Sequence, residues 1–301
     1  MNKTIRRRFI AASIALVSLT LGSVSAQATA PTVTKPAKEK LLWAQYFSEK
    51  AGTGVDKKFW THDIGDGYGW GNNEKQYYTN KKQNISTNGK GQLVITALKL
   101  DENNAADMTY RCFLYLDCLY SSAKVVTRGK LGFQYGTISA RIQNPEGVGM
   151  WPAFWMLGVP RPSCDGWPSC GEIDIVEARG SAPYHSVSSL HGPGYSGGNA
   201  FSNYYFSGNT PLTAGFHTYR VDWLPNSIKF YVDGQYVGGE RKSTISPKSW
   251  VFNAEFYLIM NLATGGNFDG GELDESILKA EMKIDWIKYE TLNGVGKLIR
   301  K

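Results

Sequence analysis

The chain has 301 residues and carries 33 basic against 26 acidic side chains, a formal net charge of +7. Four of the basic residues lie within the first eight positions, so the chain without residues 1–26 has 29 basic and 26 acidic residues, a net charge of +3. That balance excludes the strongly basic surface typical of nucleic-acid-binding proteins, and the roughly 250 residues between positions 41 and 290 suffice for one large domain.

The first segment has the order of charged, apolar and small residues typical of a signal peptide. Lys3 and the arginines at positions 6–8 precede an apolar run over residues 9–21, and Val24-Ser25-Ala26 forms a small-residue cleavage site. The apolar run is shorter than the about 20 residues needed to cross a bilayer. We therefore predict that residues 1–26 are removed and that the protein is secreted or periplasmic, with no membrane attachment. The arginine run also resembles a twin-arginine signal, which leaves the export route open.

Residues 27–40 are rich in proline, threonine and lysine and predict a flexible leader. Beyond them, short β-forming runs alternate with glycine, asparagine, aspartate and proline, which favours an all-β antiparallel sandwich over residues 41–290. Asp233-Gly234, between two alternating runs, predicts a tight hairpin. Residues 291–301 are predicted to be a loose C-terminal tail, and the protein is expected to be a monomer. The predicted strands cover residues 92–98, 136–143, 153–157, 172–177, 187–191, 217–223, 227–232, 256–262 and 282–289.

Two segments, residues 67–79 and 149–158, combine tryptophan and tyrosine with glycine, asparagine and proline. Aromatic rings displayed on a concave surface stack on sugar rings, and amide side chains bind sugar hydroxyls. The alternative is that these rings belong to the core. The two interpretations are balanced for Trp155, whereas the neighbouring glycine or proline favours a binding surface for Trp70 and Trp151.

The four cysteines form two close pairs, Cys112 with Cys118 and Cys164 with Cys170. In an exported chain this spacing favours two local disulfides over free thiols. A zinc site is a weaker interpretation, because neither pair has the two-residue gap of zinc ligands.

The run GEIDIVEAR, residues 171–179, holds three acids among β-forming residues. On a strand Glu172 and Asp174 share a face, while strict alternation puts Glu177 on the other. A β-bulge would restore Glu177 to the face of the other two, and bulges are common beside active sites. Two carboxyl groups on either side of a glycosidic bond are the catalytic groups of a retaining glycosidase. The alternative is three solvated surface acids.

The same run resembles the E-x-D-x-x-E signature of glycoside hydrolase family sixteen, in the form of its laminarinase, or endo-β-1,3-glucanase, branch. Further blocks resemble the family in its order, and together they cover nearly all of residues 41–290: GWGNNEKQYYT, YGTISARI, GMWPAFWMLG, FHTYRVDWLPNSIKFYVDG, FYLIMNLATGGN and MKIDWIKYE. The resemblance implies a β-jelly-roll of two curved antiparallel sheets with a substrate cleft on the concave face.

The resemblance also implies roles for particular residues. Glu172 is expected to be the nucleophile, Asp174 its assistant and Glu177 the general acid and base. The residues expected to bind substrate are Trp151, Trp155, Asn72, Glu74, Arg141 and His191. For His191 the alternative is an ordinary strand-end histidine.

No cofactor is expected for catalysis, but many family members hold a structural calcium, here through Asp285. The chain departs from the family in Trp43-Ala44-Gln45-Tyr46-Phe47, where relatives often have W-x-D-E-F. A second departure, SSLHGPGYSGG at residues 188–198, bears on the linkage that is cleaved.

The resulting hypothesis is an exported, retaining endo-β-glucanase whose partner is a β-1,3-linked glucan. Alternatives with the same residues are a mixed-linkage β-1,3-1,4-glucanase, a galactan hydrolase and a transglycosylase. A glucan-binding, lectin-like module is the non-enzymatic alternative, because fold alone does not determine function.

Overall fold

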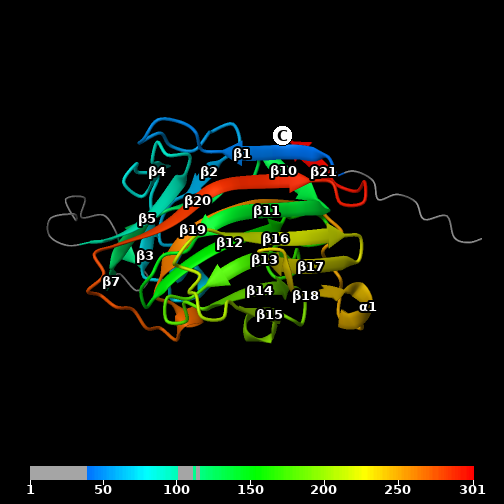
Figure 1. Ribbon diagram of the computed structural model, residues 1–301. Helices are drawn as coiled ribbons and strands as arrows, with labels where there is room; N and C mark the ends of the chain where they lie inside the picture. Colours follow the sequence, from blue (N-terminus) through cyan, green and yellow to red (C-terminus); the bar gives the residue numbers. More distant parts are fainter. Residues whose placement is uncertain (1–38, 101–110, 113–115) are drawn as a thin grey trace, which may run out of the picture. The chain divides into compact units, whose positions relative to one another are not determined.

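Short β-forming runs pair into two sheets in the computed structural model, which describes residues 39–100, 111–112 and 116–301 (Figure 1). The pairing is antiparallel throughout the named strands except between β3 and β8. The strands of the ten-stranded sheet are β1 (Leu41–Tyr46), β3 (Gln76–Tyr78), β4 (Ile85–Thr87), β5 (Leu93–Lys99), β8 (Tyr120–Ser122), β11 (Gly136–Gln143), β16 (His217–Leu224), β17 (Ser227–Val232), β18 (Gln235–Arg241) and β20 (Lys279–Glu290).

The nine-stranded sheet contains β15, β14, β13, β12, β19, β10 and β21 in spatial order, with β9 beside β19 and β2 beside β9. Figure 1 shows β12 to β15 side by side in chain order. The bounds are β2 (Thr61–Asp63), β9 (Lys124–Val126), β10 (Leu131–Gln134), β12 (Met150–Gly158), β13 (Glu172–Ala178), β14 (His185–His191), β15 (Phe201–Phe206), β19 (Phe256–Thr264) and β21 (Lys297–Arg300). β6 (Arg111–Cys112) and β7 (Leu116–Asp117) form a separate two-stranded pair, and α1 (Lys242–Ile245) follows β18.

The hydrophobic core lies between the two sheets, because alternate side chains of both contribute to one buried cluster. Ile138 and Ile142 of β11 meet Phe154 and Met156 of β12 in this cluster. Fully burying an aliphatic or aromatic side chain of this kind contributes about 1.5–3 kcal/mol to folding. The other face of the nine-stranded sheet carries a smaller apolar cluster of Val126, Tyr257 and Ile259, and its other positions are available for polar and chemically active groups.

All nine predicted strands are present, and the Asp233-Gly234 hairpin joins β17 to β18 with positive φ angles of 48° and 79°. The prediction of a loose tail at residues 291–301 is wrong, since β21 pairs with β10 and Leu298 packs against the core. Leu298 and Ile299 pair with Phe133 and Gly132 of β10, which makes this end an edge strand. The predicted signal peptide and residues 27–38 of the leader lie outside the described residues.

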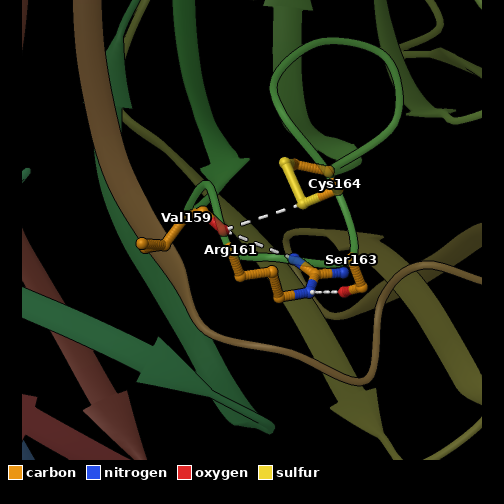
Figure 2. Close-up of a disulfide and its surroundings, with 5 residues drawn as sticks. Val159, Arg161, Ser163 and Cys164 are labelled. Carbon is orange, nitrogen blue, oxygen red and sulfur yellow. Dashed lines mark hydrogen bonds between the residues drawn. A yellow bond between two sulfur atoms is a disulfide. The ribbon is translucent and has the colours of Figure 1, made fainter.

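Both predicted disulfides are confirmed, Cys112 with Cys118 and Cys164 with Cys170. The second closes the loop before β13, and Figure 2 shows its surroundings. There the Val159 carbonyl accepts a hydrogen bond from Arg161 at 3.4 Å, and the Arg161 Nε donates to the Ser163 Oγ at 3.1 Å. Because all four cysteines are in disulfides, none has a free thiol to bind zinc, and the interpretation of the cysteine pairs as a zinc site is excluded.

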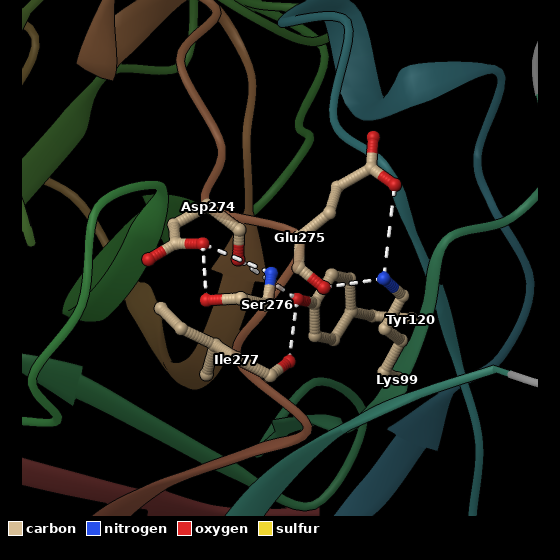
Figure 3. Close-up of polar contacts among 6 residues, drawn as sticks. All are labelled: Lys99, Tyr120, Asp274, Glu275, Ser276 and Ile277. Carbon is tan, nitrogen blue, oxygen red and sulfur yellow. Dashed lines mark hydrogen bonds and ion pairs between the residues drawn. The ribbon is translucent and has the colours of Figure 1, made fainter.

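The connection between β19 and β20 is fastened at its far end to β5 and β8 (Figure 3). The Tyr120 hydroxyl donates to the carbonyl of Ile277 at 2.7 Å, and Lys99 binds the carbonyl of Glu275. Asp274 accepts hydrogen bonds from the backbone and hydroxyl of Ser276 at 2.9 and 2.6 Å. The 3-10 turn Asn267–Asp269 lies earlier in the same connection. Within the described residues, no helix is long and apolar enough to span a membrane.

Candidate functional site

The three acids of β13 share one face of the nine-stranded sheet, as the strand register on both sides demonstrates. The residues of β14 that pair with the three acids follow one another at intervals of two, and so do the residues of β12 that pair with them. Alternate positions of a strand point the same way, and directly paired residues share a face. Glu172, Asp174 and Glu177 pair with His191, Ser189 and Val187 of β14, and with Leu157, Trp155 and Ala153 of β12.

A bulge between Asp174 and Glu177 produces this arrangement, which confirms the prediction from the odd spacing of the acids. Ile175 is the extra residue opposite β12, and both Ile175 and Val176 are buried in the core cluster. The Ser188 hydroxyl donates to the Ile175 carbonyl at 2.8 Å, so the displaced backbone group keeps a partner. The side chains of Ile175 and Val176 thus both point into the core, and that of Glu177 points to the outer face of the sheet, with Glu172 and Asp174.

Asp174 is the centre of a polar contact network. Its carboxyl is hydrogen-bonded to that of Glu172, and its Oδ2 lies 3.0 Å from the His191 Nε2. The His191 Nδ1 accepts the Gly197 backbone N–H at 3.1 Å, so a proton on the neutral ring sits at Nε2 and faces Asp174. His191 is therefore brought to the acids, where it contacts Asp174.

Burial raises the pKa of all three carboxyl groups. The pKa values of Glu172 and Asp174 lie well above the usual range, because burial disfavours their charged forms and neighbouring acids repel them. The pKa of Glu177 is raised to about 7, first by burial and then by the charge of Glu172. Charged carboxylates at this spacing repel one another, so the cluster retains protons near neutral pH.

Trp151 holds Glu177 in place. Its indole Nε1 donates to the Glu177 Oε1 at 3.0 Å, and its ring stacks on Phe268 with a centroid distance of 4.9 Å and an interplanar angle of 26°. The side chain is only 8% exposed. Phe268 belongs to the Asn267–Asp269 turn, so this turn contacts Glu177 indirectly, through the Trp151 ring.

We expect Trp151→Phe to raise the pKa of Glu177, because the indole N–H stabilises the charged carboxylate and phenylalanine keeps only the ring. An NMR titration of the labelled glutamate carboxyl measures the pKa. Trp155→Phe is the matched control, because that indole donates to Asn261 at 2.7 Å. An unchanged pKa in Trp151→Phe would show that the indole bond does not influence Glu177.

Trp155 pairs with Asp174 and therefore lies on the face of the acids. Beside it stands Lys124 of β9, whose Nζ is 4.0 Å from the Trp70 ring centroid and 5.1 Å from that of Trp155. Burial lowers the pKa of Lys124, while Asp63, Glu74 and Glu172 favour its charged form. Sequence reasoning missed Lys124, since a single lysine in a β-forming run gives no signal before its neighbours are known.

Asn72 and Glu74 lie in the loop before β3, close to this lysine. Glu74 is buried and accepts hydrogen bonds from Gln76 at 2.6 Å and Tyr78 at 3.2 Å, as well as from the Asn72 side chain. Burial raises its pKa, and its charge contributes to the raised pKa of Glu177. Glu74 is thus within electrostatic range of Glu177, and Asn72 is hydrogen-bonded to Glu74.

Arg141 does not join this group, and the prediction that it binds substrate there is wrong. Its neighbours Ala140 and Ile142 face the core, so Arg141 projects from the outer face of the ten-stranded sheet. Its Nη1 bonds to the Asp285 Oδ2 at 2.6 Å, and its guanidinium lies 4.6 Å from the Phe216 ring. Strand order, which the sequence did not reveal, decides on which sheet this strand lies.

The same ion pair bears on the predicted structural calcium. Calcium takes oxygen ligands from carboxylates, carbonyls and water. Here the Asp285 Oδ2 lies 2.6 Å from the Arg141 Nη1, and the calcium site at Asp285 stays a prediction.

Comparison with known proteins gives consistent matches over most of the chain. The family model described as glycosyl hydrolases family 16 matches residues 72–288. "Glucan endo-1,3-beta-glucosidase A1" of Niallia circulans is 36% identical over 86% of this chain, which spans 39% of that protein's length. "Beta-glucanase" of Rhodothermus marinus is 32% identical, with 83% of this chain and 84% of that protein covered. The solved laminarinase catalytic domain of Thermotoga maritima MSB8 superimposes with a TM-score of 0.73 at 35% identity, covering 84% of this chain and 98% of that one.

Proposed function

The chain belongs to glycosyl hydrolases family 16, and from this premise we propose that it cleaves β-1,3-linked glucans internally, with retention of anomeric configuration. The observation that carries the proposal is the bulge in β13, which gathers Glu172, Asp174 and Glu177 on one face. The substrate class is supported by the relatives from Niallia circulans and Thermotoga maritima, whose names specify a 1,3-glucanase and a laminarinase.

In the proposed mechanism Glu172 attacks the anomeric carbon while Glu177 gives its proton to the departing glycosidic oxygen. The bond to the leaving sugar breaks as the bond between the Glu172 carboxylate and the anomeric carbon forms. Glu177, now charged, takes a proton from water, and the resulting hydroxide equivalent releases the glycosyl group from Glu172. After the second step Glu172 is again a carboxylate and Glu177 again carries its proton.

The hydrogen bond between Glu172 and Asp174 raises the pKa of Glu172 and lowers that of Asp174, so it favours a proton on Glu172 in the free protein. Attack requires this proton to move to Asp174, which leaves Glu172 with the negative charge. Trp167 donates a hydrogen bond to Glu172, and the charge of His191 lowers the pKa of the same carboxyl. Both contacts favour an ionised Glu172, whereas the pKa of about 7 leaves about half of Glu177 protonated at pH 7.

The test is incubation of the mature protein with laminarin, lichenan and agarose, followed by an assay of reducing ends. We expect laminarin to give the most new ends, in the presence of a chelator as in its absence. Proton NMR of the first products should show the β-anomer before mutarotation. Products of inverted configuration, or no cleavage of any glucan, would refute the proposal, and longer oligosaccharides would indicate transglycosylation.

The activity should fall on both sides of a pH optimum. Glu177 must be protonated to act as an acid, so kcat/KM declines as the pH rises above about 7. Glu172 must be ionised, and its raised pKa moves the acidic limb above the range of an ordinary glutamate. A kcat/KM profile on laminarin measures both limbs; activity rising steadily to pH 9 would contradict the assignment of Glu177.

We also propose that the protein acts outside the cytoplasm as a monomer. Two disulfides formed by all four cysteines support an oxidising compartment. Size-exclusion chromatography with light scattering measures the oligomeric state.

A further inference from the structure

An edge strand next to the acids exposes large aromatic side chains. β15 ends the hydrogen-bonded order of the nine-stranded sheet, and its side chains alternate between the core and solvent. Phe201 and Tyr205 pack against the core, whereas Tyr204 is 68% and Phe206 is 60% exposed. Exposing such rings costs hydrophobic free energy, and contiguous exposed apolar groups commonly mark binding surfaces.

The strand register puts Tyr204 on the same face as the three acids. Tyr204 pairs with Val187, and Val187 pairs with Glu177, so the three residues form one row across the sheet. Two strand spacings separate Glu177 from Tyr204, about 10 Å. Trp155 lies on β12, on the opposite side of β13. The acids are thus flanked by Trp155 on one side and Tyr204 on the other.

A second exposed ring, Trp167, lies on the side of the acids where β14 and β15 run. It belongs to the loop closed by the Cys164–Cys170 disulfide (Figure 2), is 55% exposed, and its ring centroid is 6.2 Å from that of His191. The base of the loop sits tightly on β12, because a Cβ at Gly158 would lie 1.9 Å from the Cys170 carbonyl oxygen. Trp167 is therefore held beside the Glu172–His191 end of the acid row.

We propose that Trp167 and Tyr204 form the leaving-group half of the binding face, where sugar rings of a polysaccharide stack on the two aromatic rings. The inference rests on the proposed function, in which Glu177 protonates the departing sugar, and on the resemblance to glycoside hydrolase family sixteen, which implies that Trp155 lines the glycone side. The occupant is the substrate chain itself, because the row from Glu177 to Tyr204 is continuous with the catalytic face. Sugar rings present apolar faces that suit such a platform.

Tyr204 gives the cleaner test, because Trp167 also hydrogen-bonds to Glu172. β-1,3-Gluco-oligosaccharides of increasing length are cleaved by wild type, Tyr204→Ala, Tyr204→Phe and Tyr236→Ala. Tyr236 is the matched control, an exposed tyrosine on β18 of the other sheet that contacts Tyr231. End-labelled substrates show the position of the first cut, and thermal unfolding checks that each variant folds.

In wild type we expect kcat/KM to rise with substrate length. Tyr204→Ala should reduce this gain about two- to tenfold, the range of one aromatic stacking contact. The first cut should move so that fewer sugars lie on the leaving-group side. Tyr204→Phe and Tyr236→Ala should retain the wild-type length dependence.

Two results would overturn the proposal. One is an unchanged length dependence in Tyr204→Ala while wild type cleaves every oligosaccharide. The other is a wild-type dimer that Tyr204→Ala dissociates, which would make β15 an interface between copies of this chain. If the proposed function itself were wrong, wild type would cleave none of the oligosaccharides, and this result differs from both outcomes above.

Discussion

Replacing Glu172 with glutamine is expected to lower kcat on laminarin by on the order of 10⁴-fold or more, the scale of removing a nucleophile that acts together with partner groups. Glutamine has the same shape and can still accept the hydrogen bond from Trp167, but its neutral amide cannot attack the anomeric carbon. Binding should be affected far less than chemistry, because the rings and polar groups around the acids are unchanged. Initial rates of reducing-end release measure the loss.

Two controls accompany this variant. Isothermal titration of the Glu172→Gln protein with laminari-oligosaccharides should still detect binding, which separates loss of chemistry from loss of folding. Glu281→Gln changes a glutamate that pairs with Lys279 and Lys283 on the ten-stranded sheet, and it should retain wild-type activity. Wild-type turnover in Glu172→Gln would eliminate the proposed nucleophile.

Replacing Glu177 with glutamine should lower kcat on glucans about 10²- to 10⁴-fold, the usual contribution of general acid–base catalysis. The first step on an aryl glucoside with a good leaving group should suffer much less, because that oxygen departs without a proton. The alkaline limb near pH 7 should also disappear from the kcat/KM profile, since it reports Glu177. Equal losses on both substrates, with the alkaline limb retained, would assign the acid to another residue.

The same variant should change stability with a definite sign. Folding raises the pKa of Glu177 from 4.5 to about 7, so its contribution to stability is complete below pH 4.5 and is lost as the pH rises through 7. Glutamine cannot ionise, and Glu177→Gln should therefore gain stability relative to wild type between pH 4 and pH 8. We expect a relative gain on the order of 1–3 kcal/mol in the free energy of unfolding, measured by urea denaturation at the two pH values.

Several features of the protein could be predicted from the residues alone because they depend on local periodicity. Alternation of apolar residues located nine strands, and Asp233-Gly234 located a hairpin. The cysteine spacing indicated both disulfides. The spacing of the three acids predicted a bulge. In a regular strand, residues an odd number of positions apart, such as Asp174 and Glu177, point to opposite faces, so an extra residue is needed to put them on the same face.

Other features depend on which strands become neighbours. Arg141 was expected to bind substrate, yet β11 lies in the ten-stranded sheet and directs it outward to Asp285. β15 was not predicted at all, since the run FSNYYF exposes aromatic rings where a half-buried strand usually exposes polar side chains. The tail became an edge strand on β10, more than 160 residues earlier in the chain.

The sequence by itself determined the class of fold, the family and the identity of the three acids, since those follow from residue types at short, fixed spacings. Only the tertiary structure decided what surrounds the acids: Trp151 bonded to Glu177, Lys124 between two tryptophans, and Tyr204 at the end of their row. The physical reason is that local periodicity settles the direction of a side chain relative to its own strand. Strand order depends on contacts between distant segments, and it decides which side chains of other strands lie beside that side chain.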